Sequence, residues 1–306
     1  MPAPWVIVGC GYTGAYLARA LVGRGVAVTL TRRDPAAAAE LADSLLAGAA
    51  AGGARAGTES DARGADAEAR TDRSSRPIPV VRGVVAELGD PASLAGLVAP
   101  GAIVCCLAPP GPDPSGEIRN LLETSRDAAR LVYVSSTSVY APGGGAWVDE
   151  SWPIAPTTEA GRVRALAEAA LAAATVPWIA LRAAGIHGPG RKLVDRIRSG
   201  TYRVIDDGTS HVSRIHVVDL VSAILAAGAS DARGFVNVAD DDPTPLGEVA
   251  DTLAGLLGLP PPPRVPAASV SPELAGMLTA DRRISNRRLK EELGVKLRYP
   301  SWRSEL

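Results

Sequence analysis

A chain of 306 residues, 46% of them hydrophobic, carries enough apolar side chains for a substantial core. Its 32 lysine and arginine residues nearly balance 33 acidic residues, and the formal net charge of −1 excludes an overall field that would attract nucleic acid or an anionic membrane. No apolar run approaches the roughly 20 residues that cross a bilayer, and the first residues lack the features of a signal peptide, so we expect a cytoplasmic protein.

The amino end carries a glycine pattern between a predicted strand at residues 5–8 and a predicted helix. Gly9 permits a tight turn, Gly11 lets a pyrophosphate approach the backbone, and Gly14 lets the helix pack close to the strand. Backbone N–H groups at the helix start would face the phosphates. The G-x-G-x-x-G spacing in this context predicts a dinucleotide site, and the residues assigned to it are Gly9, Gly11, Tyr12, Thr13 and Gly14.

A second buried strand is predicted at residues 26–31, and it is followed by two arginines, Arg32 and Arg33. At this place in a dinucleotide-binding fold, an acidic residue binds the ribose 2′-hydroxyl, whereas an arginine neutralises a 2′-phosphate. The first acidic residue is Asp34. The pair therefore favours NADP(H) over NAD(H), and the alternative is a solvated pair of loop charges.

A helix is predicted at residues 36–46, and the segment that follows has a different composition. Residues 47–77 contain hardly any aliphatic side chain larger than alanine. Such a segment cannot bury enough surface to offset the entropy of ordering it, so we predict a disordered insertion.

The remaining elements continue the alternation of strands and helices. The strand ending at Leu107 and Ala108 should pass beside the cofactor, because ligands of open parallel sheets bind at the carboxyl ends of the strands. The pattern predicts an α/β fold: a doubly wound parallel Rossmann sheet with a small carboxyl-terminal substrate lobe. Strands are predicted at residues 78–84, 102–108 and 131–137, and helices at 118–129 and 246–257.

The predicted division places an NAD(P)-binding Rossmann domain at residues 1–185 and the substrate lobe at residues 186–306. Residues 212–238 are predicted to return to the Rossmann domain. The substrate would lie between the two parts.

The three cysteines match neither a disulfide framework nor a metal-ligand spacing, so we expect buried thiols and no metal centre. Cys10 lies in the glycine loop, and Cys105 and Cys106 lie in the predicted strand 102–108. If the first and fourth strands are neighbours, Cys10 and Cys106 should lie close together.

Five segments in order carry a family likeness. They are the glycine pattern, Tyr-Val-Ser-Ser-Thr-Ser-Val-Tyr at 133–140, Asp-Glu-Ser-Trp-Pro at 149–153, the segment 181–190 with Ile-His-Gly-Pro-Gly, and Arg-Ile-His-Val-Val-Asp-Leu at 214–220. Together they resemble the extended short-chain dehydrogenases/reductases of the NAD-dependent epimerase/dehydratase family, most of all the atypical YeeZ-like bacterial proteins. The resemblance spans nearly the whole chain outside the insertion. It implies an NAD(P)-binding oxidoreductase or epimerase that acts on a small carbonyl or sugar-like substrate, and it allows a homodimer.

The resemblance also implies a catalytic set, which this chain matches only in part. Thr137 stands where the family has a serine or threonine that polarises the substrate. The family's Tyr-x-x-x-Lys pair falls on Ala160 and Arg164. Arginine stays charged at any relevant pH, so Arg164 could hold the ribose but could not supply the missing proton donor.

Three other residues are candidates for the missing chemistry. Tyr140 could replace the acid or could simply pack beside the site, and His187 could shuttle a proton or could be a structural loop histidine. The resemblance implies that Arg214 binds a phosphate or carboxylate of the substrate; otherwise it would pair with Asp219 or another local acid.

Two functions stay open on this evidence. One is catalysis with a small-molecule substrate through Thr137, Tyr140, Arg164 or His187. The other is a non-catalytic NADP(H) sensor or scaffold, favoured by the loss of the tyrosine at Ala160.

Overall fold

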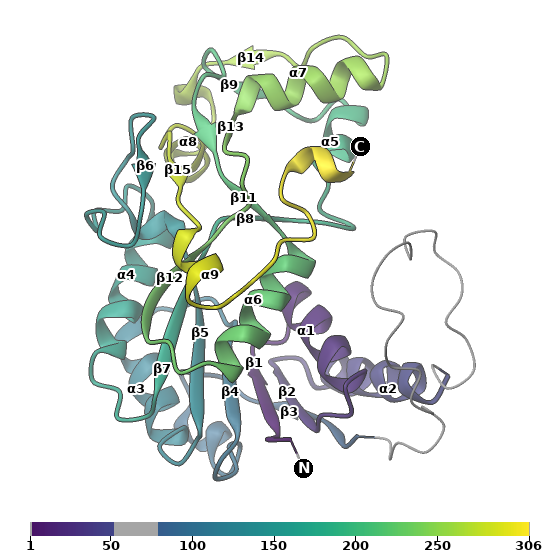
Figure 1. Ribbon diagram of the computed structural model, residues 1–306, viewed down its shortest axis with the longest axis vertical. Helices are drawn as coiled ribbons and strands as arrows, with labels where there is room; N and C mark the ends of the chain where they lie inside the picture. Colours follow the sequence, from purple (N-terminus) through teal and green to yellow (C-terminus); the bar gives the residue numbers. More distant parts are fainter. Residues whose placement is uncertain (1, 52–78, 306) are drawn as a thin grey trace.

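The central sheet of the computed structural model, which describes residues 2–51 and 79–305, has seven parallel strands (Figure 1). Their spatial order is β3-β2-β1-β4-β5-β7-β12. This arrangement confirms the predicted doubly wound α/β fold. The strands are β1 (Trp5–Val8), β2 (Val28–Arg32), β3 (Val81–Val85), β4 (Ile103–Cys106), β5 (Arg130–Ser136), β7 (Trp178–Ala183) and β12 (Gly234–Val238).

The first strand shows how strand register sorts side chains between two cores. Ile7 is aligned with Cys105 and lies in the core on one face of the sheet, whereas Val8 is aligned with Cys106, which lies in the core on the other face. Cys10 joins the first core together with Cys105. The prediction that Cys10 lies beside Cys106 is therefore wrong, because successive residues of a strand point to opposite faces. All three thiols are free and buried.

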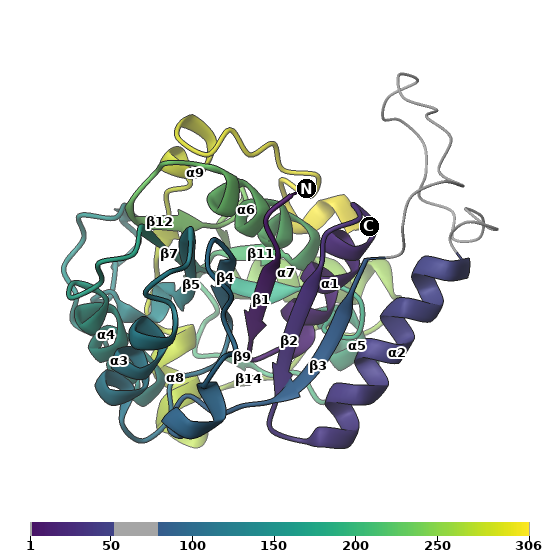
Figure 2. The same cartoon turned by 90° about the horizontal axis from the view of Figure 1, so that it is seen from below.

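Helices cover both faces of the sheet (Figure 2). One face is covered by α1 (Tyr12–Val22), α2 (Pro35–Ala51) and α6 (Val217–Ala229). The other is covered by α3 (Pro114–Thr124), α4 (Glu159–Leu171) and the short 3-10 helix η2 (Pro91–Leu94). Capping side chains start several of these: Asp113 accepts from the N–H of Gly116, and Thr158 accepts from the N–H of Gly161.

The second helix is longer than the sequence suggested. It continues to Ala51, so the prediction of disorder is wrong for residues 47–51. Alanine is the best helix former, so a lack of large aliphatic side chains does not by itself end a helix. The remaining residues of the predicted insertion, 52–77, lie outside the described residues.

A smaller lobe stands above the sheet in Figure 1 and has its own core. Short strand pairs and helices build it, and its core includes Ile197, Tyr202, Leu253 and Trp302. Its elements are β8 (Gly185–His187), α5 (Leu193–Arg198), β9 (Val204–Ile205), β10 (His211–Val212), β11 (Arg214–His216), β13 (Thr244–Pro245), α7 (Leu246–Leu256), β14 (Arg264–Val265), η4 (Ala267–Ser269), α8 (Pro272–Leu278) and η5 (Trp302–Glu305).

Three further short elements and a 3-10 turn connect the lobe to the sheet. They are η3 (Thr137–Val139), β6 (Trp147–Val148), β15 (Arg283–Ile284) and α9 (Arg287–Glu291), and β15 pairs with β6. Among the described residues, no helix is long and apolar enough to span a membrane.

Candidate cofactor and substrate sites

A cavity of about 660 Å³, here named the dinucleotide cavity, opens at the carboxyl ends of β1, β2, β3 and β4. Parallel strands of this topology place ligands at that edge. Of the residues assigned to a cofactor by sequence, the cavity is lined by Gly9, Gly11, Tyr12, Arg32, Arg33 and Ala108. Two others do not line the cavity: Thr13 is buried in α1, and Leu107 packs against the core.

The three glycines meet three different surroundings. Gly9 has φ +79°, and a Cβ atom there would lie 2.6 Å from the Cα atom of Ala108. A Cβ atom on Gly14 would lie 2.9 Å from the Sγ atom of Cys10, so these two glycines are required by packing. A Cβ atom on Gly11 would meet no atom within 4 Å.

The start of α1 fits a phosphate group. Gly11 is the residue that caps this helix, and no side chain accepts a hydrogen bond from the first N–H groups. Helix N-termini of this kind bind anions through those donors and the helix dipole. The open space at Gly11 therefore lies where a pyrophosphate would sit, and the described residues fit a dinucleotide.

The arginines after β2 border the same cavity. The Nε–H of Arg32 donates to the carbonyl oxygen of Cys10 at 2.8 Å, which fixes its side chain across the glycine loop. Asp34 also lines the cavity, but its Oδ1 accepts from the N–H groups of Ala36 and Ala37 at the start of α2. One oxygen of the Asp34 carboxylate is thus used for capping, and Arg32 and Arg33 are the arginines among the residues that line this cavity.

Glu117, in the first turn of α3, is a lining residue that the sequence analysis missed. Its Oε2 atom accepts from the N–H of Gly111 at 2.7 Å. This bond fixes the loop that follows β4. The sequence did contain a signal for this role. Glu117 follows Pro114 closely, in the first turn of a helix that begins six residues after Ala108.

Thr137 and Arg164 are both tied to the carboxyl end of β5. Thr137 begins the turn after the strand, and its carbonyl oxygen accepts from Nη1 of Arg282 at 3.4 Å. Arg164 donates from Nη1 to the carbonyl oxygen of Val134 at 2.6 Å. Ala160 is exposed one turn earlier in α4, where its N–H donates to Glu273 of α8 at 3.3 Å.

Tyr140 lies inside the core. Its hydroxyl donates to Oδ1 of Asn237 at 2.7 Å and accepts from Nη1 of Arg182 at 2.9 Å. Burial raises the pKa of Tyr140 to about 12, although Arg182 acts in the opposite direction. The structure therefore places this phenol in a buried hydrogen-bond network rather than at the wall of the dinucleotide cavity.

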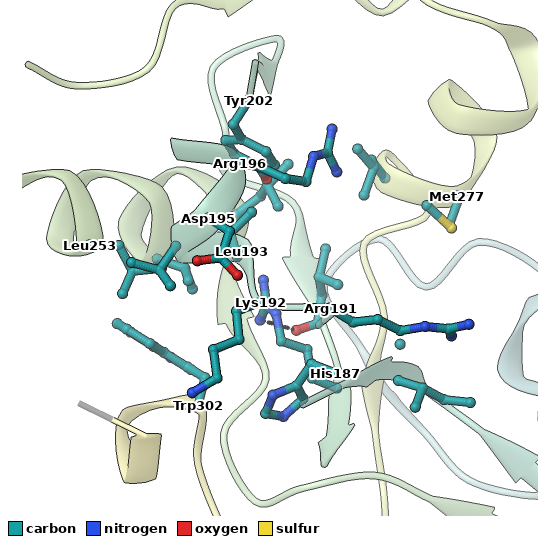
Figure 3. A pocket seen from close by; sticks show the side chains of 18 of the residues that line it. His187, Arg191, Lys192, Leu193, Asp195, Arg196, Tyr202, Leu253, Met277 and Trp302 are labelled. Atoms are coloured by element: carbon teal, nitrogen blue, oxygen red, sulfur yellow. Dashed lines mark hydrogen bonds between the residues drawn. The ribbon is translucent and has the colours of Figure 1, made fainter. Parts of the chain in front are cut away.

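A second cavity, of about 570 Å³ and here named the lobe cavity, lies among α5, α7, α8 and η5 (Figure 3). His187 and Arg214, both singled out by sequence, line it, and Figure 3 shows His187 at the opposite end from Tyr202. The His187 ring stands edge-on to the ring of His216, with centroids 5.2 Å apart. His216 in turn caps α6 by accepting from the N–H of Val218.

Arg214 is held in the wall of the lobe cavity. Its Nη1 donates to the carbonyl oxygen of Val212 at 2.9 Å. Burial lowers its pKa, and the nearest opposing charges are Asp240 and Asp242. Asp219 does not pair with it: that carboxylate accepts from the backbone N–H groups of Arg298 and Tyr299.

The described residues contain no group of three or more histidine, cysteine, aspartate or glutamate side chains that could hold a metal ion. The chemistry that this geometry offers is therefore built from backbone N–H groups, guanidinium groups, one threonine and one imidazole.

Comparison with known proteins gives three kinds of match. Residues 116–239 match the model of the NAD dependent epimerase/dehydratase family. A Streptomyces protein named 3-diazoavenalumate denitrifying reductase is 35% identical over 206 residues, which cover 61% of this chain and 67% of the relative.

Two solved structures cover nearly the whole chain. A functionally unknown conserved protein from Silicibacter pomeroyi DSS is 30% identical, with a TM-score of 0.74 over 98% of this chain and 95% of that one. The human epimerase family protein SDR39U1, solved with NADPH, is 18% identical, with a TM-score of 0.67 over 98% and 97%.

Proposed function

Because this chain belongs to the NAD dependent epimerase/dehydratase family, we propose that it is an NADP(H)-dependent oxidoreductase acting on a small carbonyl or sugar-like substrate in the lobe cavity. The observation that carries the proposal is the open space at Gly11, beside Arg32 and Arg33, in the dinucleotide cavity. The reductase name of the Streptomyces relative supports reduction as the direction. The closer likeness to YeeZ-like proteins stays a prediction.

The bound nicotinamide would supply the hydride, and the protein's own residues would bind and orient. Arg164, whose guanidinium is fixed to the Val134 carbonyl, would hold the cofactor ribose. Thr137 offers a hydroxyl at the end of β5 to orient the substrate oxygen. His187, which lines the lobe cavity, replaces the absent tyrosine as proton donor; Tyr140 is excluded from that role by its burial.

Titration of the purified protein with NADPH and with NADH, followed by nicotinamide fluorescence, tests the cofactor. NADPH should bind at least tenfold more tightly than NADH. The double variant Arg32→Gln/Arg33→Gln should lose this preference by weakening NADPH alone, because it removes the charges opposite a 2′-phosphate. Equal affinities in the original protein would reject the preference for NADP(H).

A pair of glycine variants tests the cavity itself. Gly11→Ala should weaken NADPH binding at least tenfold with little change in thermal stability, because the added methyl group enters the open space. Gly255→Ala is the matched control: it too meets no atom within 4 Å, but it lies in α7. Similar NADPH affinities in the two variants would place the cofactor elsewhere.

A non-catalytic NADP(H) sensor is the second candidate, and the position of Ala160 favours it. The family's tyrosine is absent, and α8 is bonded to this turn of α4 through Glu273. Tight NADPH binding without oxidation by any member of a carbonyl panel would support the sensor. Turnover that falls strongly in both Thr137→Ala and His187→Gln would support the enzyme.

A further inference from the structure

The lobe cavity has two chemically different sides and few neutral polar groups. From this composition we infer that its ligand is an amphipathic organic anion, with an apolar body and one carboxylate or similar head, rather than a nucleotide sugar. The inference rests on the proposed function, because it names the substrate class for the same site.

The apolar side is formed by helices of the lobe and its last turn. Figure 3 shows Leu253 of α7 and Met277 of α8 facing each other across the cavity. Met277 is 55% exposed, so it presents apolar surface that a ligand could cover. A ligand with an apolar body would remove this surface from water, at a gain of about 25 cal/mol per Å² buried.

The basic side comes from β8, from the loop before α5, from α5 and from β11. Its basic residues are His187, Arg191, Lys192, Arg196 and Arg214, and the one acidic residue in the lining is Asp195. Arg198, outside the lining, already pairs with Asp195 at 3.3 Å. The cavity therefore carries an excess of positive charge.

Two of these arginines, Arg191 and Arg196, are held in place by aromatic rings without being neutralised. The guanidinium of Arg191 lies 4.2 Å from the centroid of the Tyr12 ring, and that of Arg196 lies 5.2 Å from the Tyr202 ring. Within the described ranges, neither they nor Arg214 form an ion pair with a carboxylate. Aromatic rings orient a guanidinium and leave its charge available to an incoming anion.

Neutral hydrogen-bonding side chains are few in this wall, where Tyr202 contributes a hydroxyl. The lining residues, all in the described part of the chain, include no serine, threonine, asparagine or glutamine. The indole N–H of Trp302 is already used, since it donates to Oγ1 of Thr244 at 3.0 Å. A neutral sugar ring or base placed here would find mainly charged groups as partners, and each of its hydroxyl or amide groups that is buried unpaired costs about 1–3 kcal/mol.

Binding of small probes to the full chain, measured by calorimetry without NADPH, tests the ligand class. The probes are 3-phenylpropionate, its neutral amide, acetate and UDP-glucose. The acid should bind at least tenfold more tightly than each of the other three, because only it has both an apolar body and an anionic head. An amide that binds as tightly as the acid, or UDP-glucose that binds more tightly, would overturn the inference.

Two arginine variants locate the site. Arg196→Gln should weaken 3-phenylpropionate binding five- to tenfold, because it removes a cation from the cavity wall. Arg126→Gln is the control: Arg126 is exposed, pairs with Glu123 and, like Glu123, lies outside the lining, so this change should alter the affinity less than twofold. Equal losses in the two variants would show a diffuse charge effect and contradict the assignment.

The two proposals can fail separately. NADPH binding with no preference for the acid would reject the amphipathic anion and leave the dinucleotide function standing. Binding of the acid that depends on Arg196, without any NADPH binding, would reject the dinucleotide function and support the ligand class.

Discussion

Asp240, which follows β12, is a buried carboxylate with incomplete hydrogen bonding. It is 2% exposed; its Oδ1 accepts from the N–H of Asp242 at 3.2 Å, and its Oδ2 has no hydrogen-bond partner among the described residues. Burial raises its pKa from 3.8 to about 7, although Asp242's N–H and the nearby Arg214 act in the opposite direction. The folded protein therefore binds a proton here that the unfolded chain releases near pH 4.

This shift predicts a pH dependence of stability. Between pH 4 and 7 Asp240 is protonated in the folded state and ionised in the unfolded state, so its contribution to the free energy of unfolding falls as the pH rises and levels off above pH 7. Asp240→Asn removes the titration. Its stability relative to the original protein should rise by about 2 kcal/mol between pH 5 and pH 8. Urea unfolding of both proteins at each pH measures the difference, and parallel pH profiles would contradict it.

Residues whose role is contained in a local unit could be identified from sequence. Gly9 and Gly14 belong to one strand-helix unit, and the contacts at the two glycines match the packing roles inferred from their spacing. Tyr140 could not be placed, because its partners Arg182 and Asn237 lie 42 and 97 residues away. The surroundings of Arg214 were equally out of reach, since they depend on Asp240, which follows β12 and whose N–H donates to the carbonyl oxygen of Arg214 at 2.7 Å.

At the scale of elements, the contact between α4 and β7 depends on one buried ion pair. Arg182 of β7 donates from Nη2 to Glu168 of α4 at 2.7 Å, and both side chains are less than 5% exposed. The same guanidinium bonds the Tyr140 hydroxyl and lies 4.0 Å from the centroid of the Phe235 ring. The carboxylate, the hydroxyl and the aromatic ring around the Arg182 guanidinium all interact favourably with its positive charge.

Breaking the Arg182–Glu168 ion pair should lower the free energy of unfolding. Glu168→Gln leaves a buried guanidinium without its counter-charge, and we expect a loss of about 3 kcal/mol in the free energy of unfolding. Glu159→Gln is the control on the same helix: it breaks the ion pair with Arg162, which is more than half exposed, and should cost less than about 1 kcal/mol. Guanidinium chloride is unsuitable because it screens charge, so urea unfolding is the measurement. Similar losses in both variants would contradict the assignment.

Element boundaries were harder to predict than element types. Apolar runs located β1, β2, β4 and β5, because strands buried on both faces are continuously apolar. The end of α2 was missed because its last turns are alanine and glycine, which carry no amphipathic pattern. The short strand pairs of the lobe, such as β10 with β13, depend on contacts between distant segments and have no local signal.

At the scale of the whole molecule, Tyr12 joins the two cavities. It lines the dinucleotide cavity at the start of α1, and its hydroxyl donates to the carbonyl oxygen of Pro189 at 3.0 Å. Its ring supports the guanidinium of Arg191, which lines the lobe cavity. A ligand that orders the Tyr12 ring in one cavity therefore also orders a cation in the other.

This connection predicts that the two ligands bind cooperatively. NADPH should raise the affinity for 3-phenylpropionate about fivefold, and by linkage the acid should raise the affinity for NADPH by the same factor. Tyr12→Leu removes the ring that supports Arg191 and should reduce the coupling to less than twofold, whereas Tyr12→Phe keeps the ring and should retain most of it. Calorimetric titrations of each ligand, with and without the other at saturation, measure all four affinities of the cycle. Coupling that survives unchanged in Tyr12→Leu would show that the cavities communicate by another route, since Arg191 would then need no aromatic support to respond to the cofactor.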